Sequence, residues 1–166
     1  MENPTFVATA RLDDETSSHL NLLRRRYFPS HRNFIDAHLT LFHALSPDAV
    51  TLLGRAAAET DRRAFEVVLP GPIPLGRGVA IRVESARLVS LRGDLARPLT
   101  DLSAQDRQPY RPHVTVQNKV TAEEASACLA ELRRDWLPRV ARVEGMDLWE
   151  YLGGPWQHHS RIDFPG

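Results

Sequence analysis

The chain alternates between short runs with a two-residue hydrophobic period and longer runs with a helical period. Alternation and β-forming residues predict strands over residues 5–12, 37–45, 64–69, 79–83, 139–151 and 160–164, with one more inside 110–119. Helices are expected between them, beginning after Asp13 or Asp14, Ser46, Ser85 and Thr121. The predicted order is strand, helix, strand, helix, strand, strand, helix, strand, helix, strand, strand.

The start signals of the predicted helices are specific. Ser46 followed by Pro47 combines a capping residue with the residue preferred at the first helical position. Thr121-Ala122-Glu123-Glu124 is a capping box, and Cys128 falls on the apolar face of its helix, which favours packing over a reactive thiol. Arg24-Arg25-Arg26 is interpreted as a solvated helix end, with phosphate contact as the alternative.

Chain length and connection lengths constrain the fold class. A chain of 166 residues can form one domain that buries a core without disulfides. Several connections are too short for crossovers between parallel strands, so we expect an α+β architecture with antiparallel pairing. Residues 1–166 are expected to form a single domain.

Two stretches repeat the pattern His, apolar, Thr, apolar. They are His38-Leu39-Thr40-Leu41 and His113-Val114-Thr115-Val116. On a strand, the His and the Thr share one face and the apolar pair points the other way. Each motif strand is followed by a capped helix, which indicates two related halves facing each other across a groove.

Regular alternation places further side chains on the polar face of each motif strand. Phe42 follows Thr40 by two residues, and its ring could stack on a base. Gln117 and then Lys119 follow in the second motif, and Lys119 could meet a phosphate. Groove lining and a solvated strand end are the alternatives. Arg111 shares the face of His113, is held extended by Pro112 and is the better anion-binding candidate.

The overall charge limits the class of partner. Lys plus Arg (21) balances Asp plus Glu (21), so there is no bulk basic field for gripping long duplex nucleic acid. Local charge still suffices for a small anionic ligand or the end of a strand. One cysteine suits a reducing compartment, no apolar run reaches about 20 residues, and from Met1-Glu2-Asn3-Pro4 we expect no signal peptide. We expect a cytoplasmic protein without membrane contact; its oligomeric state is left open.

The remaining histidines and tryptophans have other interpretations. His38 and His43 have odd spacing, which places them on opposite faces of a continuous strand, and no Cys pair or His-Glu-x-x-His helix is present. No metal or other cofactor is therefore expected. His158 and His159 are interpreted as surface or rim residues, and Trp156 as packing or groove lining.

A pair of imidazoles suits phosphoryl transfer. In-line displacement at phosphorus needs a base on the attacking oxygen and an acid on the leaving oxygen. A histidine pKa of about 6.5 allows one ring to be neutral and the other charged near neutral pH. Each Thr hydroxyl can donate to a non-bridging phosphate oxygen. The structural alternative is that each strand histidine is simply a hydrogen-bonded residue.

The two motifs, the second preceded by Tyr110-Arg111-Pro112, resemble those of the two-histidine phosphoesterase superfamily, and in particular its 2′-5′ RNA ligase-like and cyclic phosphodiesterase branch. The resemblance implies a bilobal α+β fold in which two antiparallel sheets face a central cleft, with helices packed on the outside. It implies metal-independent opening of a 2′,3′-cyclic phosphate, or formation and reversal of 2′-5′ linkages. His38 and His113 would be the acid–base pair, in an order left open, and Thr40 and Thr115 would bind phosphate. The partner would be a small cyclic-phosphate nucleotide or an RNA terminus.

Two other function classes use the same sequence features. One is a non-catalytic module that binds a nucleotide or phosphorylated ligand in the same cleft without turnover. The other retains an ancestral site while contact with a protein partner matters more, and it predicts an exposed apolar patch away from the cleft.

Overall fold

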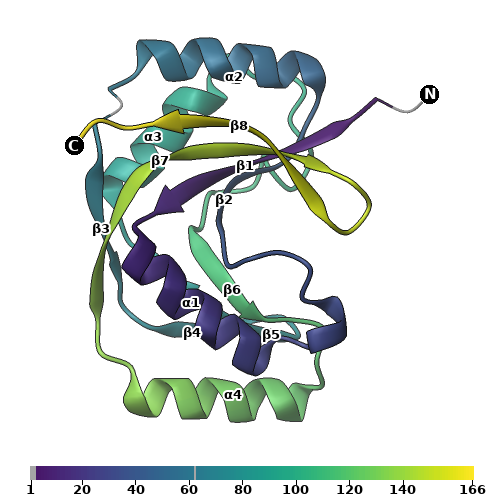
Figure 1. Ribbon diagram of the computed structural model, residues 1–166, viewed down its shortest axis with the longest axis vertical. Helices are drawn as coiled ribbons and strands as arrows, with labels where there is room; N and C mark the ends of the chain where they lie inside the picture. Colours follow the sequence, from purple (N-terminus) through teal and green to yellow (C-terminus); the bar gives the residue numbers. More distant parts are fainter. Residues whose placement is uncertain (1–2, 62) are drawn as a thin grey trace.

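The computed structural model describes residues 3–61 and 63–166 of the chain. Within them it contains eight strands, four α-helices and one 3-10 helix (Figure 1). In chain order these are β1 (Thr5–Leu12), α1 (Asp14–Tyr27), η1 (Ser30–Arg32), β2 (Leu39–Leu45), α2 (Pro47–Glu59), β3 (Phe65–Leu69), β4 (Pro72–Leu75), β5 (Gly78–Arg82), α3 (Ala86–Ala96), β6 (His113–Gln117), α4 (Ala122–Asp135), β7 (Arg139–Tyr151) and β8 (Trp156–Asp163).

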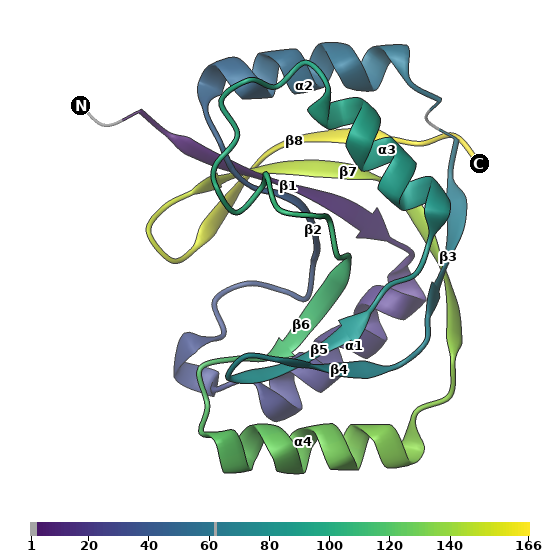
Figure 2. The same cartoon turned by 180° about the vertical axis from the view of Figure 1, so that it is seen from behind.

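The strands pair antiparallel in the order β3-β7-β1-β2-β6-β5-β4, and β8 pairs with β7. The α+β class and the antiparallel pairing are confirmed. The two sheets expected to face a cleft are joined into one curled sheet, and across the described residues a single pair, Leu39 with Val114, links β2 to β6. The link is narrow, so the sheet has two halves, which Figure 2 shows from behind.

The predicted helix starts are confirmed by their caps. Side chains of Asp13, Ser46, Ser85 and Thr121 each accept a hydrogen bond from a backbone N–H in the first turn of α1, α2, α3 and α4. The capping box of α4 is complete, because the Glu124 side chain also accepts from the Thr121 N–H. These bonds satisfy backbone donors that a helix N-terminus otherwise leaves without partners.

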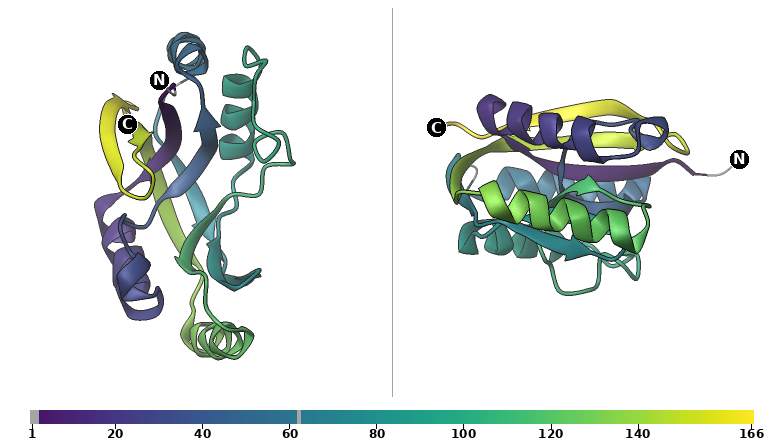
Figure 3. Two further views of the ribbon diagram at one scale, coloured as in Figure 1. Left: turned by 90° about the vertical axis from the view of Figure 1, so that its right-hand side faces the viewer. Right: turned by 90° about the horizontal axis from the view of Figure 1, so that it is seen from below.

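The helices lie at the periphery of the molecule (Figure 3). Helices α1 and α4 pack on the half formed by β4, β5 and β6, whereas α2 packs on β1, β2 and α3. The aliphatic residues of both motif strands face this interior: Leu39, Leu41, Val114 and Val116 are at most 1% exposed. Their partners across the strand, the histidines and threonines, therefore face the concave side.

Strand β4 lies between the strands predicted over residues 64–69 and 79–83, in a stretch for which no strand was predicted because Pro70-Gly71-Pro72 ends the first of these β-forming runs. Pro72 and Pro74 are nevertheless compatible with a strand at the end of the sheet, since an edge position needs no donor on its open side. In the described part of the chain, none of the helices combines the length and the apolar character needed to cross a membrane.

Candidate active site

The two motifs meet at the junction of β2 and β6. Leu39 pairs with Val114 in antiparallel register. One residue further in each direction, this register sets Thr40 across from His113 and His38 across from Thr115. Each histidine therefore lies beside the threonine of the other motif, as well as two residues from its own.

Both motif histidines are held by the same local hydrogen bond. Nδ1 of His38 donates to the carbonyl of Asp36 at 2.8 Å, and Nδ1 of His113 donates to the carbonyl of Arg111 at 2.7 Å. A carbonyl can only accept, so Nδ1 carries the hydrogen in each ring. Nε2 of each ring is therefore left for a ligand.

Both pairs face one cavity of about 310 Å³. The cavity is lined by His38, Thr40, His113 and Thr115 together with Val7, His43, Leu75, Gln105, Asn118 and Trp156. Its volume and polar lining suit a phosphate group with part of the molecule that carries it.

A β-bulge changes the expected face of the residues after Thr40. Ala8 pairs with Phe42 but the next residue, Thr9, pairs with Thr40, so β2 contains an extra residue at Leu41, and a second register shift follows between Phe42 and Leu45. As a result Phe42 is fully buried in the core, and its predicted role in stacking on a base is wrong. His43 takes its place on the cleft side, contrary to the prediction that it faces away from His38.

The second motif strand, β6, also contains a β-bulge. Val79 pairs with Gln117 and Ala80 with Thr115, which leaves an extra residue at Val116 in β6. Gln117 is consequently buried, and Asn118 lines the cavity instead. Lys119 is exposed in a left-handed conformation with φ 60°, and the residues that line the cavity do not include it.

Arg111 lies at the rim rather than inside the central cavity. Its side chain is exposed, and it borders a neighbouring cavity of about 120 Å³ together with Thr40, His43 and His113. It also borders a larger groove of about 820 Å³ between β5 and α3. The residues that line this groove do not include the motif histidines or threonines. The candidate active site is therefore the cavity of about 310 Å³, because both motif histidines and both motif threonines line it.

Each bulge is braced by an arginine from a helix. Arg92 of α3 donates from Nε to the Leu41 carbonyl at 3.2 Å, and its guanidinium stacks on Phe42 at 4.3 Å. Arg24 of α1 donates from Nη1 to the Thr115 carbonyl at 3.0 Å and is only 4% exposed. The interpretation of Arg24 as part of a solvated helix end is therefore wrong, because its side chain is buried.

The surroundings of His38 disfavour a positive charge on its ring. Burial lowers the pKa of His38 to about 4, and the positive charge of Arg24 acts in the same direction, against the hydrogen bond to Asp36. Burial also lowers the pKa of Arg24 to about 10, so this guanidinium stays charged at neutral pH. His38 is therefore neutral over the physiological range.

His43 is paired with a buried carboxylate. Asp106 accepts from the Nδ1 of His43 at 2.9 Å, from the His43 N–H at 2.9 Å and from the Ala44 N–H at 3.0 Å. Burial alone would raise the pKa of Asp106, but these hydrogen bonds outweigh it and lower the pKa below its ordinary value. Sequence reasoning missed this pair, because nothing in the spacing of residues 43 and 106 indicates it.

Aromatic side chains border the His38 end of the cavity. The Trp156 ring lies 4.6 Å from the His38 ring, and both line an adjoining cavity of about 250 Å³ with Phe34 and Trp149. Trp156 thus lines the cavity and also packs against Trp149, with 6.2 Å between the ring centroids, so both interpretations of this residue apply. These rings, and not Phe42, form the aromatic surface of the cleft.

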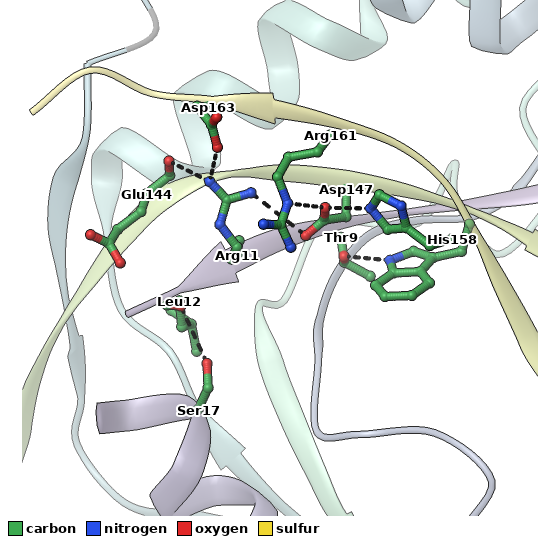
Figure 4. A network of polar contacts seen from close by, with 10 residues as sticks. Thr9, Arg11, Leu12, Ser17, Glu144, Asp147, His158, Arg161 and Asp163 are labelled. Atoms are coloured by element: carbon green, nitrogen blue, oxygen red, sulfur yellow. Dashed lines mark hydrogen bonds and ion pairs between the residues drawn. The ribbon is translucent and has the colours of Figure 1, made fainter. Parts of the chain in front are cut away.

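A polar network fixes the β7–β8 ribbon that carries Trp156 (Figure 4). The buried Asp147 accepts from Nε2 of His158 at 2.9 Å and from Nε of Arg161 at 3.0 Å, and Nη1 of Arg11 lies 3.8 Å away. His158 thus has a structural partner in β7. Among residues 3–61 and 63–166, no group of three or more His, Cys, Asp or Glu side chains has an arrangement that could hold a metal ion.

Comparison with solved structures identifies the fold. Escherichia coli LigT complexed with 3′-AMP superposes with a TM-score of 0.66 at 17% identity, covering 99% of this chain and 100% of that one. The protein TT0787 of Thermus thermophilus gives 0.67 at 18% identity over 98% of both chains. Kluyveromyces marxianus Usb1 gives 0.53 at 17% identity over 99% of this chain and 98% of its own. The chain therefore has the fold of the two-histidine phosphoesterases.

The family follows from a sequence comparison. The family model of the 2′-5′ RNA ligase superfamily matches residues 12–155, which include both motifs. The chain belongs to this superfamily, and the resemblance inferred from the motifs is confirmed. A comparison with curated proteins gives no match.

Proposed function

We propose that this protein is a metal-independent phosphodiesterase that acts on 2′,3′-cyclic phosphate nucleotides or on RNA ends. The observation that carries the proposal is the convergence of both histidines and both threonines on one cavity. Membership of the 2′-5′ RNA ligase superfamily supports the same class of reaction.

The proposed mechanism uses the two rings as base and acid. Neutral His38 accepts a proton from water at Nε2, and the water oxygen forms a bond to phosphorus. His113 donates a proton from Nε2 to the leaving ribose oxygen as its bond to phosphorus breaks, which yields a nucleoside monophosphate. The hydroxyls of Thr40 and Thr115 donate to the non-bridging oxygens, where negative charge accumulates.

The remainder of the cleft supports a nucleotide as substrate. Trp156 and Phe34 offer aromatic surface next to the reacting phosphate, and a nucleobase can stack on such rings. Arg111 at the rim can attract the phosphate of a longer strand. Escherichia coli LigT has been crystallised with 3′-AMP, which supports a nucleotide ligand for this fold.

The proposal is tested by hydrolysis of 2′,3′-cyclic nucleotides in the presence of a chelator. The wild-type chain should turn over, and His38→Ala and His113→Ala should each lower kcat by about 10²–10⁴-fold, because each removes one proton-transfer group. His31→Ala, which changes an exposed histidine in η1, is the matched control and should keep wild-type activity.

Two results would contradict the proposal. Undiminished turnover in either motif variant would remove the acid–base assignment. Saturable nucleotide binding without turnover of any cyclic or 2′-5′-linked substrate would favour the non-catalytic binding module.

A further inference from the structure

We propose that His43 is a third phosphate-contacting imidazole of this cleft and that Asp106 is its positioning residue. The inference rests on the proposed function, because it concerns a further group acting on the same phosphate. It concerns binding of the anion, which can be measured whether or not the chain catalyses hydrolysis.

The β-bulge at Leu41 brings His43 to the cavity. Without the bulge, regular alternation would direct this ring to the interior and Phe42 to the cleft. The bulge exchanges the two residues, so that His43 lines the same cavity as His38 and His113. Arg92 donates to the Leu41 carbonyl and stacks on Phe42, which holds the bulged backbone in this arrangement.

Asp106 fixes the orientation and the tautomer of the His43 ring. Its carboxylate is 1% exposed and lies 2.9 Å from Nδ1 of His43, so Nδ1 carries the hydrogen and Nε2 remains for a ligand. The same carboxylate accepts the N–H groups of His43 and Ala44, and Nη2 of Arg92 donates to the Asp106 carbonyl at 2.6 Å. Asp106 therefore fixes the position of His43 through hydrogen bonds to both its backbone N–H and its ring.

The second motif shows what this position supplies when it is not a histidine. Its bulge at Val116 directs Asn118 to the cavity, and the Asn118 Oδ1 accepts from the Lys119 N–H. The amide nitrogen of Asn118 is then the group left for a ligand. Both halves thus place His, Thr and one more nitrogen donor around the cavity, and the first half alone pairs that donor with a carboxylate.

The carboxylate indicates an anionic ligand at His43. When Nε2 donates to a phosphate oxygen the ring carries a positive charge, and the adjacent carboxylate of Asp106 stabilises that charge. Because this carboxylate is buried and Asp106 is not among the residues that line the 310 Å³ cavity, it does not itself face the phosphate. The first half of the cleft can therefore add one charge-assisted hydrogen bond to those of the two threonines.

The test is titration of the folded protein with inorganic phosphate by calorimetry at pH 6. His43→Asn keeps a donor near the position of Nδ1, and so a partner for Asp106, but removes the group at Nε2. We expect this variant to bind phosphate about 10–100-fold more weakly than the wild type. His43→Gln returns a donor near Nε2 and should bind about threefold or more tightly than His43→Asn. His31→Asn, an exposed change of the same kind, should bind like the wild type.

A double variant separates positioning from fold stability. Asp106→Asn should weaken phosphate binding in the wild-type background but not further in the His43→Asn background, because Asp106 acts through His43. A purely structural role would lower affinity equally in both backgrounds, and that result would overturn the role of Asp106.

Equal phosphate affinity of His43→Asn and wild type would overturn the proposal, and so would a wild-type chain that does not bind phosphate. Loss of phosphate binding in His43→Asn with no hydrolysis by the wild type would leave this inference standing and reject the proposed enzymatic function.

Discussion

At the scale of single residues, His38 lines the cavity and has a strongly lowered pKa. Its ring is half-buried beside Trp156, and its Nδ1 is bound to the Asp36 carbonyl. Burial is the largest cause that lowers its pKa, with Arg24, His43 and His113 adding to it. A neutral ring is the form required of a general base, and the same environment has a consequence for stability.

We expect stability to fall with pH below 6.5 because of His38. The pKa of this ring is about 4 in the folded chain, against 6.5 for an ordinary histidine, so between these values the unfolded state binds more protons. The wild type should lose on the order of 2 kcal/mol from this residue as pH falls from 6.5 to 4. Chemical unfolding at several pH values should show a smaller loss for His38→Gln, and an identical pH dependence would contradict the burial of this ring.

At the scale of elements, Gly78 and the bulge of β6 depend on each other. A Cβ at residue 78 would overlap the Gln117 carbonyl oxygen, a backbone atom that cannot move without shifting the bulge. We expect Gly78→Ala to destabilise the fold by about 2–4 kcal/mol and to displace Asn118 from the cavity.

Gly54→Ala is the matched control, because a Cβ in that part of α2 meets no atom within 4 Å. It should be neutral or stabilising by up to about 1 kcal/mol. Thermal unfolding of the two variants compares them directly, and equal stability would show that β6 does not need its bulge.

The elements also show how far the sequence can predict the site. Periodicity and capping residues gave the helices, most strands and the two His-Thr faces, because these depend on local patterns. Period-two alternation failed directly after the Thr of each motif. There a bulge buries Phe42 and Gln117 and directs His43 and Asn118 to the cavity. A bulge depends on pairing with β1 or β5 and on distant arginines, so no local pattern indicated it. The pairing of His43 with Asp106 is likewise set by tertiary structure.

At the scale of the whole molecule, the sheet is continuous although the cleft divides it into two halves. Strand β7 pairs with β1, β3 and β8, and Figure 1 shows it running along the side of both lobes. Trp136 donates to the Leu69 carbonyl near α4, whereas Trp149 donates to Thr9 in the other half. Tryptophan fluorescence therefore reports on the unfolding of both halves.

We propose that residues 1–166 unfold as one cooperative unit. Tryptophan fluorescence and far-ultraviolet circular dichroism should follow the same urea transition, in the wild type and in Trp136→Phe, because the halves are joined by the pairing of β2 with β6 and by the bridge between Val68 and Glu84. Two separate transitions would instead indicate lobes that fold independently.

The most direct measurement is a crystal structure of the chain grown with phosphate. We expect one anion in the cavity between β2 and β6, with Nε2 of His38 and Nε2 of His113 on opposite sides of phosphorus and the hydroxyls of Thr40 and Thr115 on its oxygens. Motif histidines whose Nε2 atoms point away from a shared anion, or an empty cavity at saturating phosphate, would contradict it.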